Sequence, residues 1–199
     1  MRVIAGSAKG RKLESVPGTS TRPITDRVKE ALFNILGASI EGARFLDLFA
    51  GTGAVGIEAL SRGAARAVFC ERDRLALRTI GHNLQATGLA DRARVVAGDA
   101  FRFLRNPGGE RFDFVYIAPP QYKGIWIRAL QAVDEGDVLA PGGIAIVQIH
   151  PKERQDVPLR RLRLFDERRY GSTLLLFYRL EEGEANGTEA APAAEDQAG

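Results

Sequence analysis

The sequence predicts an α/β fold with five parallel strands, a C-terminal antiparallel hairpin and a short basic N-terminal extension. From residue 44 onward, short apolar segments alternate with segments of helical periodicity, a pattern typical of a parallel sheet covered on both faces. Two apolar segments then flank Tyr170-Gly171-Ser172 with no room for a crossover helix, so we expect them to pair antiparallel at a sheet edge. The expected strands are 44–49, 67–71, 94–97, 112–117 and 143–149, the helices between them 54–62, 73–87, 99–105 and 123–135, and the hairpin strands 159–169 and 173–180.

The chain before this sheet reads as a separate basic segment. Residues 3–5 and 12–16 could pair across a turn that contains Gly6 and Gly10. Thr21-Arg22-Pro23 interrupts the chain, and apolar residues then recur at helical spacing over 28–36. We therefore expect a basic hairpin and helix over 1–40, the main domain over 41–180 and an acidic, disordered tail over 181–199.

The overall charge hides an asymmetry along the chain. The net charge of the 199 residues is +3, but residues 181–199 hold six acids and no Lys or Arg. That leaves 28 basic against 19 acidic residues before the tail, a charge of +9. The positive charge of residues 1–180 suits a polyanionic partner such as nucleic acid. A genome that favours arginine would give the same count of basic residues.

Composition also excludes several classes of protein. No run approaches the roughly 20 apolar residues that span a bilayer, and the N-terminus lacks the apolar region of a signal peptide. A single cysteine, Cys70, excludes an internal disulfide framework, and with only His82 and His150 beside it we expect no metal site. These features predict a cytoplasmic protein without a membrane partner.

A glycine motif lies between the first expected strand and the helix after it. Gly51-x-Gly53-x-x-Gly56 in this position lets a ligand approach the backbone N–H groups at the helix start. Glu71 ends the second expected strand, twenty residues after Gly51, a spacing that suits a carboxylate accepting both hydroxyls of a ribose. The alternative for Glu71 is a solvated acid at a strand end. The motif predicts a site for an adenosine-containing cofactor.

The terminal hairpin distinguishes two folds that carry such a motif. A nicotinamide-binding Rossmann domain continues with a sixth parallel strand, whereas the expected hairpin resembles the class I S-adenosylmethionine-dependent methyltransferase fold. That resemblance implies S-adenosylmethionine as the cofactor, lying across the carboxyl ends of the first three strands. Asp47 would approach its methionine amino group, or would satisfy backbone N–H groups of the turn. The residues expected to bind it in the first loop are Asp47, Phe49, Ala50, Gly51, Thr52 and Gly53.

The third expected strand is followed by Asp99, Ala100 and Phe101. By the same resemblance, the Asp99 carboxylate would accept from the adenine amino group and Phe101 would lie beside the ring. The alternatives are an N-cap for the helix that follows and a core position for Phe101.

The fourth expected strand ends in Ala118-Pro119-Pro120-Gln121-Tyr122. This segment resembles the Asp/Asn-Pro-Pro-Tyr/Phe motif of methyltransferases that modify exocyclic amino groups. Acceptors on the loop would position the amine, prolines would fix the loop, and an aromatic face would stack on the base. Ala118 replaces the acidic or amide residue, and Gln121 separates the prolines from Tyr122. We expect Ala118, Pro119, Pro120 and Tyr122 to form the catalytic part of the site, with the backbone carbonyls of Ala118 and Pro119, or the amide oxygen of Gln121, in place of the missing side chain.

Blocks outside these motifs resemble one family. The chain is similar over residues 1–180 to bacterial 16S rRNA (guanine-N(2))-methyltransferases of the RsmD type, on the blocks Arg2-Val3-Ile4-Ala5-Gly6, Gly10-Arg11-Lys12-Leu13, Thr21-Arg22-Pro23, 26–34 and 58–64. The resemblance implies methylation of the 2-amino group of a guanine in 16S rRNA, within the small ribosomal subunit or its assembly intermediate. We also expect the protein to be a monomer. The bases expected to contact RNA phosphates are Arg2, Lys9, Arg11, Lys12, Arg22 and Arg27, whose alternative role is solubility.

Three other functions remain open from the sequence. A catalytically weak, methyltransferase-like RNA-binding assembly factor would keep the cofactor loop without turnover. A methyltransferase could instead act on another nucleobase amine, such as adenine in DNA. A nucleotide-dependent oxidoreductase would bind NAD and not S-adenosylmethionine, so binding measurements with both ligands separate it from the leading hypothesis.

Overall fold

The computed structural model describes residues 1–18 and 24–181, and the core of this part is a seven-stranded sheet with the order β3-β2-β1-β4-β5-β7-β6. The first five strands are parallel, and β7 pairs antiparallel with both β5 and β6. The predicted fold class is confirmed. The strands are β1 (Arg44–Asp47), β2 (Arg66–Glu71), β3 (Ala93–Ala97), β4 (Phe112–Ile117), β5 (Leu139–Ile149), β6 (Leu162–Tyr170) and β7 (Thr173–Leu180).

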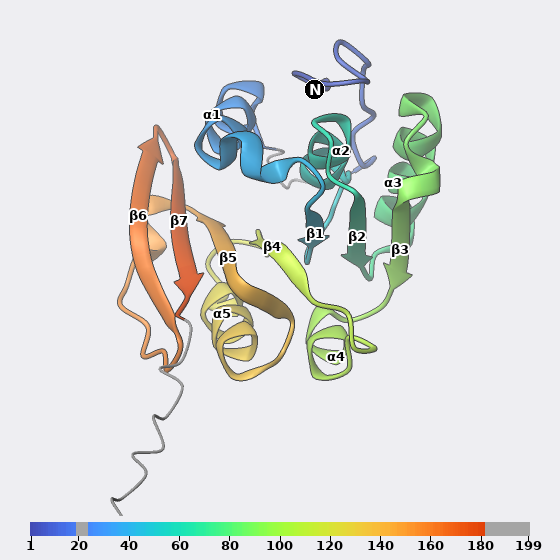
Figure 1. Cartoon of the computed structure of the whole chain (residues 1–199). Coiled ribbons are helices and arrows are strands. Elements are labelled where there is room, and N and C mark those ends of the chain that lie inside the picture. The colour runs from blue at the N-terminus through green and yellow to red at the C-terminus, as the bar shows by residue number, and fades with distance from the viewer. Residues whose placement is uncertain (19–23, 182–199) are drawn as a thin grey trace, which may run out of the picture.

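Helices cover both faces of the sheet, as Figure 1 shows. One face packs against α1, α2 and α3, and the other against α4 and α5. The expected tail beyond residue 181 lies outside the described residues. The helices are α1 (Asp26–Leu36), α2 (Ala54–Ser61), α3 (Arg74–Thr87), α4 (Ala100–Arg105) and α5 (Ile125–Glu135), with 3₁₀ turns η1 (Gly37–Ile40), η2 (Ala90–Arg92) and η3 (Pro151–Glu153).

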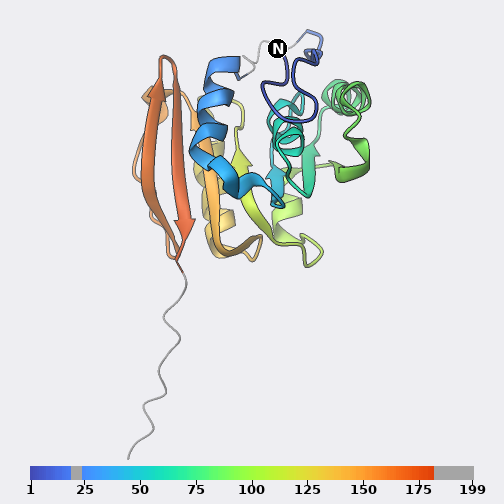
Figure 2. The same ribbon diagram turned by 45° about the horizontal axis from the view of Figure 1, so that its top comes forward.

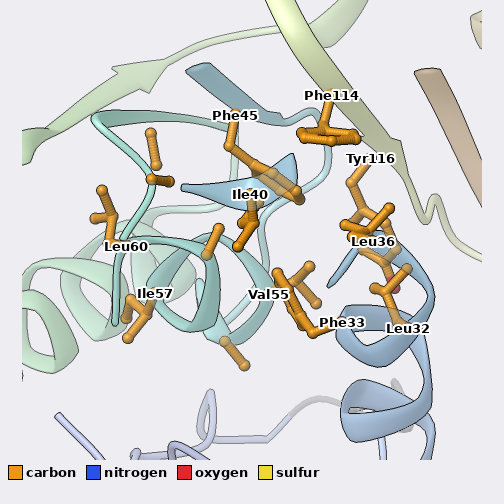
Figure 3. Packing of buried hydrophobic residues seen from close by; sticks show 14 of the residues in the cluster. Leu32, Phe33, Leu36, Ile40, Phe45, Val55, Ile57, Leu60, Phe114 and Tyr116 are labelled. Carbon is orange, nitrogen blue, oxygen red and sulfur yellow. The ribbon is translucent and has the colours of Figure 1, made fainter. Parts of the chain in front are cut away.

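The two faces of the sheet bury separate apolar clusters. Leu32 and Phe33 of α1 join Phe45 of β1 and Phe114 of β4 in the first cluster (Figure 3). The second cluster contains Trp126 of α5, which is 2% exposed. Each central strand contributes residues to both clusters, because successive side chains along a strand point to opposite faces of the sheet. Helix α1 is thus packed on the same core as the sheet.

The N-terminal arm, residues 1–18, lies beside α1 and α2 (Figure 2). The expected hairpin is reduced to a single antiparallel bridge between Arg2 and Lys12. The reason is that the N–H groups of Ile4 and Ala5 donate to the side chain of Glu58 on α2 and not to a partner strand. The arm therefore packs as an irregular segment anchored on α2.

The strand order indicates where on the sheet a ligand site is expected. In the sequence of strands, the chain moves outward from β1 to β2 and β3, then returns to β4 on the other side of β1. Ligands of open parallel sheets bind beyond the carboxyl ends of the strands at such a reversal. β1 ends at Asp47, two residues before the expected end, so Phe49 belongs to the loop that leaves this edge. None of the helices in the described parts of the chain is long and apolar enough to cross a membrane.

Candidate functional site

Two glycines shape the loop between β1 and α2. Gly53 precedes α2 with φ 76°, a left-handed conformation that side chains disfavour. Gly56 lies in the first turn of α2, where an added β carbon would come within 2.3 Å of Cε1 of Phe69 on β2. The helix start can therefore approach the sheet only because both positions are glycine, which leaves the loop directly above the ends of β1 and β2.

The side chain of Asp47 forms a hydrogen bond with the start of α2, directly after this loop. Its side chain is 2% exposed and its Oδ2 accepts the N–H of Gly56 at 3.2 Å. Burial raises the pKa of Asp47 to about 7, against the opposing effect of the bond from Gly56. The carboxylate thus lies against the backbone at the start of α2. This contact fits the second of its two expected roles, in which Asp47 satisfies backbone N–H groups of the turn.

Glu71 joins the end of β2 to the same loop. Its Oε2 accepts the N–H of Gly51 at 2.8 Å, and its Oε1 accepts the N–H groups of Arg72 and Asp73 at 2.8 and 2.9 Å. A carboxylate has about four acceptor positions, so one remains for a hydroxyl of a ligand. The half-buried side chain is oriented by three backbone donors before any ligand binds.

Asp99, Ala100 and Phe101 follow β3 on the same edge of the sheet. Asp99 is exposed and caps α4, since its Oδ1 accepts the N–H of Arg102 at 3.0 Å. Ala100 is buried, while Phe101 is half-buried, with the guanidinium of Arg128 4.7 Å from its ring centre. The N-cap role of Asp99 leaves its second oxygen available to a ligand.

The loop after β4 leaves the sheet next to the glycine loop, because Asp47 of β1 is in register with Tyr116 of β4. We call residues 118–124 the acceptor loop. Ala118 is half-buried and Pro119 is buried, whereas Pro120 is exposed. Tyr122 is 64% exposed and has φ 59°, and its ring lies 5.7 Å from that of His150. The aromatic face thus stands outside the core at this edge.

The N-terminal arm carries most of the basic side chains that were expected to contact RNA. Arg2, Lys9, Arg11 and Lys12 are exposed, as is Arg27 on α1. The Arg2 guanidinium lies 3.4 Å from the Asp26 carboxylate, so its charge is partly compensated. Arg22 lies outside the described residues.

A buried ion pair anchors the arm. Both side chains of Lys29 and Glu58 are fully buried, and Nζ of Lys29 lies 3.2 Å from Oε2 of Glu58. Glu58 also accepts from Nε of Arg62 at 2.8 Å and from the N–H groups of Ile4 and Ala5 at 2.9 and 3.0 Å. Four donors compensate one buried carboxylate, as burial of a charge requires.

Sequence reasoning missed two contributors to the site. Asn83 of α3 is fully buried and bonds both Glu14 of the arm and Thr52 of the glycine loop. Glu153 bonds Tyr122 of the acceptor loop. A polar residue on the apolar face of an amphipathic helix was the available signal for Asn83, whereas Glu153 has no signal of this kind in the sequence.

The family model described as Conserved hypothetical protein 95 matches residues 1–179. The chain belongs to the Conserved hypothetical protein 95 family. The match includes the N-terminal arm, the glycine loop and the acceptor loop, so the whole site lies within the family domain.

Relatives in this family are methyltransferases by name. The chain is 44% identical over 77% of its length, and 84% of the other chain, to "Putative rRNA methyltransferase YlbH" of Bacillus subtilis. It is 36% identical to "Ribosomal RNA small subunit methyltransferase D" of Escherichia coli K12, over 94% of this chain and 92% of that one. The solved structure "Putative methyltransferase yhhF from Escherichia coli" is 38% identical with a TM-score of 0.79, covering 91% and 98% of the two chains.

These findings confirm the family resemblance and the enzyme class expected from the sequence. The chain is a methyltransferase of the Conserved hypothetical protein 95 family, with the class I methyltransferase fold. The roles of individual residues stay predictions.

Proposed function

We propose that the chain transfers a methyl group from S-adenosylmethionine to the exocyclic 2-amino group of one guanine in 16S rRNA, within the small ribosomal subunit or its assembly intermediate. The observation that carries this proposal is the edge of the sheet where the glycine loop and the acceptor loop leave adjacent parallel strands. A small cofactor on the first loop and a nucleobase on the second would be neighbours. A ribosomal substrate implies the cytoplasm, and we take the enzyme to act as a monomer.

The residues of the glycine loop fit the cofactor. Gly53 and Gly56 lack the β carbons that would hold α2 away from the sheet, and Glu71 is already oriented toward the loop by Gly51. A ribose hydroxyl donates a hydrogen bond, which the remaining acceptor position of the Glu71 carboxylate can take. Asp99 offers a further acceptor to an adenine amino group from the end of β3. When bound, S-adenosylmethionine supplies a methyl group activated by its sulfonium.

The acceptor loop would position the guanine. Ala118 has no polar side chain, so we assign the backbone carbonyls of Ala118 and Pro119 as acceptors for the amine. Tyr122 supplies an exposed aromatic face on which an extracted base can stack. The amine nitrogen then bonds to the methyl carbon while the carbon–sulfur bond breaks, and its proton leaves to solvent. Proximity and alignment are the chief contributions of this loop, because the methyl group needs no further activation.

The test is transfer of a labelled methyl group to small subunits that lack this modification. Naked 16S rRNA and duplex DNA are the two control substrates. We expect label on the particle, at one guanine, above the label on either control. Binding of S-adenosylmethionine with no label on the particle would point to an RNA-binding assembly factor, and label on DNA adenine would point to a different nucleobase amine.

A further inference from the structure

We propose that Glu153 is a positioning residue for methyl transfer, because its two carboxylate oxygens hold the acceptor loop and the chain after β5 in one arrangement. The inference rests on the proposed function, since it concerns how Tyr122 is presented to the base. Glu153 lies in η3, just beyond the carboxyl end of β5, and β5 is the neighbour of β4 in the sheet. It therefore stands beside the acceptor loop although 31 residues separate it from Tyr122.

The contacts of Glu153 connect two segments. Its Oε1 accepts the N–H of Tyr122 at 2.8 Å, and its Oε2 accepts the N–H of His150 at 3.2 Å. Nδ1 of His150 in turn accepts the N–H of Lys152 at 3.2 Å, which fixes the imidazole ring. The ring of Tyr122 packs against this imidazole at 5.7 Å with an interplanar angle of 43°. Backbone and ring of Tyr122 are thus both held by the chain after β5.

The backbone of Tyr122 needs such a restraint. Among the residues that the structure describes, it is the one non-glycine residue with positive φ, at 59°. A bulky side chain disfavours that conformation, which persists only where the surroundings fix it. A charge-assisted bond to the Tyr122 N–H is a restraint of this kind. Glu153 thereby selects a conformation that the loop alone would not keep.

The alanine at position 118, where the resembled motif has Asp or Asn, makes this restraint matter for turnover. Ala118 has no side-chain acceptor for the target amine, so alignment depends on the loop backbone and on stacking. A shift of about 1 Å in a positioning group can reduce the rate about 100-fold. The residues proposed to bind the cofactor lie elsewhere, since Glu71 ends β2 and Asp99 follows β3. In the described part of the chain, their hydrogen bonds involve neither Glu153 nor the acceptor loop. We therefore expect Glu153 to affect turnover and not cofactor affinity.

The first experiment is Glu153→Gln, assayed on small subunits with single-turnover kinetics and with S-adenosylhomocysteine binding by calorimetry. Glutamine keeps one acceptor oxygen where two N–H donors need one each. We expect the rate to fall about 10- to 100-fold while the Kd for S-adenosylhomocysteine stays within about twofold. Glu135→Gln on the exposed surface of α5 is the matched control and should leave both unchanged. An unchanged rate in Glu153→Gln overturns the inference.

A double-mutant cycle with Tyr122→Gly separates positioning from general support of the fold. Glycine tolerates φ 59° and has no ring to present, so Glu153 can no longer act through the position of that ring in this background. We expect Glu153→Gln to cost less than about twofold when added to Tyr122→Gly. The same loss of about 10- to 100-fold in both backgrounds would show that Glu153 acts elsewhere, and would overturn the inference.

Amide hydrogen exchange tests the restraint without any substrate. In Glu153→Gln the amide of Tyr122 should exchange at least about tenfold faster, whereas the amide of Leu162, which bonds Asp134, should not change. If the wild-type enzyme leaves small subunits unlabelled, the proposed function fails and this measurement still decides whether the restraint exists. Equal exchange of the Tyr122 amide in both proteins overturns the restraint itself.

Discussion

The side-chain amide of Asn83 donates to the backbone carbonyl of Thr52 at 3.0 Å, which joins α3 to the glycine loop. The same side chain accepts the N–H of Glu14 at 2.8 Å and donates to its carbonyl at 3.1 Å. One fully buried amide therefore fixes both the glycine loop and the N-terminal arm. Loop and arm are mechanically connected through α3.

Replacing Asn83 by alanine should weaken cofactor binding and the fold together. The change removes three partly buried hydrogen bonds, two with Glu14 and one with the Thr52 carbonyl, each worth about 0.5–1.5 kcal/mol. We expect a lower free energy of unfolding in urea and a higher Kd for S-adenosylmethionine by calorimetry. Gln85→Ala, exposed on the same helix, should change neither. A Kd equal to that of wild type would show that the loop does not depend on Asn83.

Glu58→Gln should be among the most destabilising substitutions in the chain. It leaves the ammonium of Lys29 buried without its counter-charge, and removal of one partner from a buried pair costs about 3–5 kcal/mol. Urea unfolding measures the cost, with exposed Glu30→Gln as the control. Adding Lys29→Met to Glu58→Gln should restore part of the stability, because the fully buried ammonium is then removed. A double variant less stable than Glu58→Gln would contradict this account.

Glu71→Ala tests the ribose assignment. The change removes the acceptor proposed for the diol and also the bond from the Gly51 N–H at 2.8 Å. Loss of hydrogen bonds to a charged group costs about 1.5–3 kcal/mol, so the Kd for S-adenosylmethionine should rise about 10- to 100-fold. Calorimetry gives the value, and Glu135→Ala is the control. Unchanged affinity would place the cofactor away from β2.

Asp47→Asn should change how stability depends on pH. Burial raises the pKa of folded Asp47 to about 7, above its value near 3.8 in the unfolded chain. The folded state therefore holds an extra proton between these values, and the native protein loses stability as pH rises through this range. Asparagine keeps an acceptor for Gly56 but does not ionise. We subtract the unfolding free energy of wild type from that of the variant at each pH. This difference should rise by about 2–4 kcal/mol between about pH 4 and pH 8. A pH-independent difference would contradict the raised pKa.

The basic arm should determine the salt dependence of RNA binding. Arg11 and Lys12 are exposed, and removing one cation that neutralises a phosphate reduces the slope of log K against log salt by about 0.7–0.9. The double variant Arg11→Ala/Lys12→Ala should bind small subunits more weakly, with a shallower slope. Arg105→Ala/Arg111→Ala removes the same charge from exposed positions outside the arm. Equal effects of both double variants would mean that net charge, and not the arm, governs binding.

The strands were predictable where apolar residues mark them clearly. β4 occupies the expected range 112–117, because its burial on both faces gives a short apolar run with polar neighbours. β1 is shorter than expected, since Leu48 is buried in the loop and continues the apolar pattern past the strand. β5 begins at Leu139, before the expected start, because Pro141 and the glycines after it conceal a strand that shifts register against β4.

The site was predictable only where it follows from strand order. Asp47, Glu71 and Asp99 end or follow consecutive strands, and parallel strands bring such ends to one edge. The bonds of Asn83 to Glu14 and of Glu153 to Tyr122 span 69 and 31 residues. Contacts of that range depend on how loops cross the sheet, which neither periodicity nor motif spacing specifies.

Anchoring of the arm on α2 has a consequence for the order of folding. Glu58 and Ser61, which bond Ile4, Ala5 and Ala8, enter the growing chain more than fifty residues after them. During synthesis these residues of the arm therefore lack their partners on α2 until that helix has emerged, and a large loop must close before they meet. Its contacts should form late in the folding transition, after β1 and α2 have packed. A nascent chain would carry Lys9, Arg11 and Lys12 on a segment that is not yet anchored to α2 until that point.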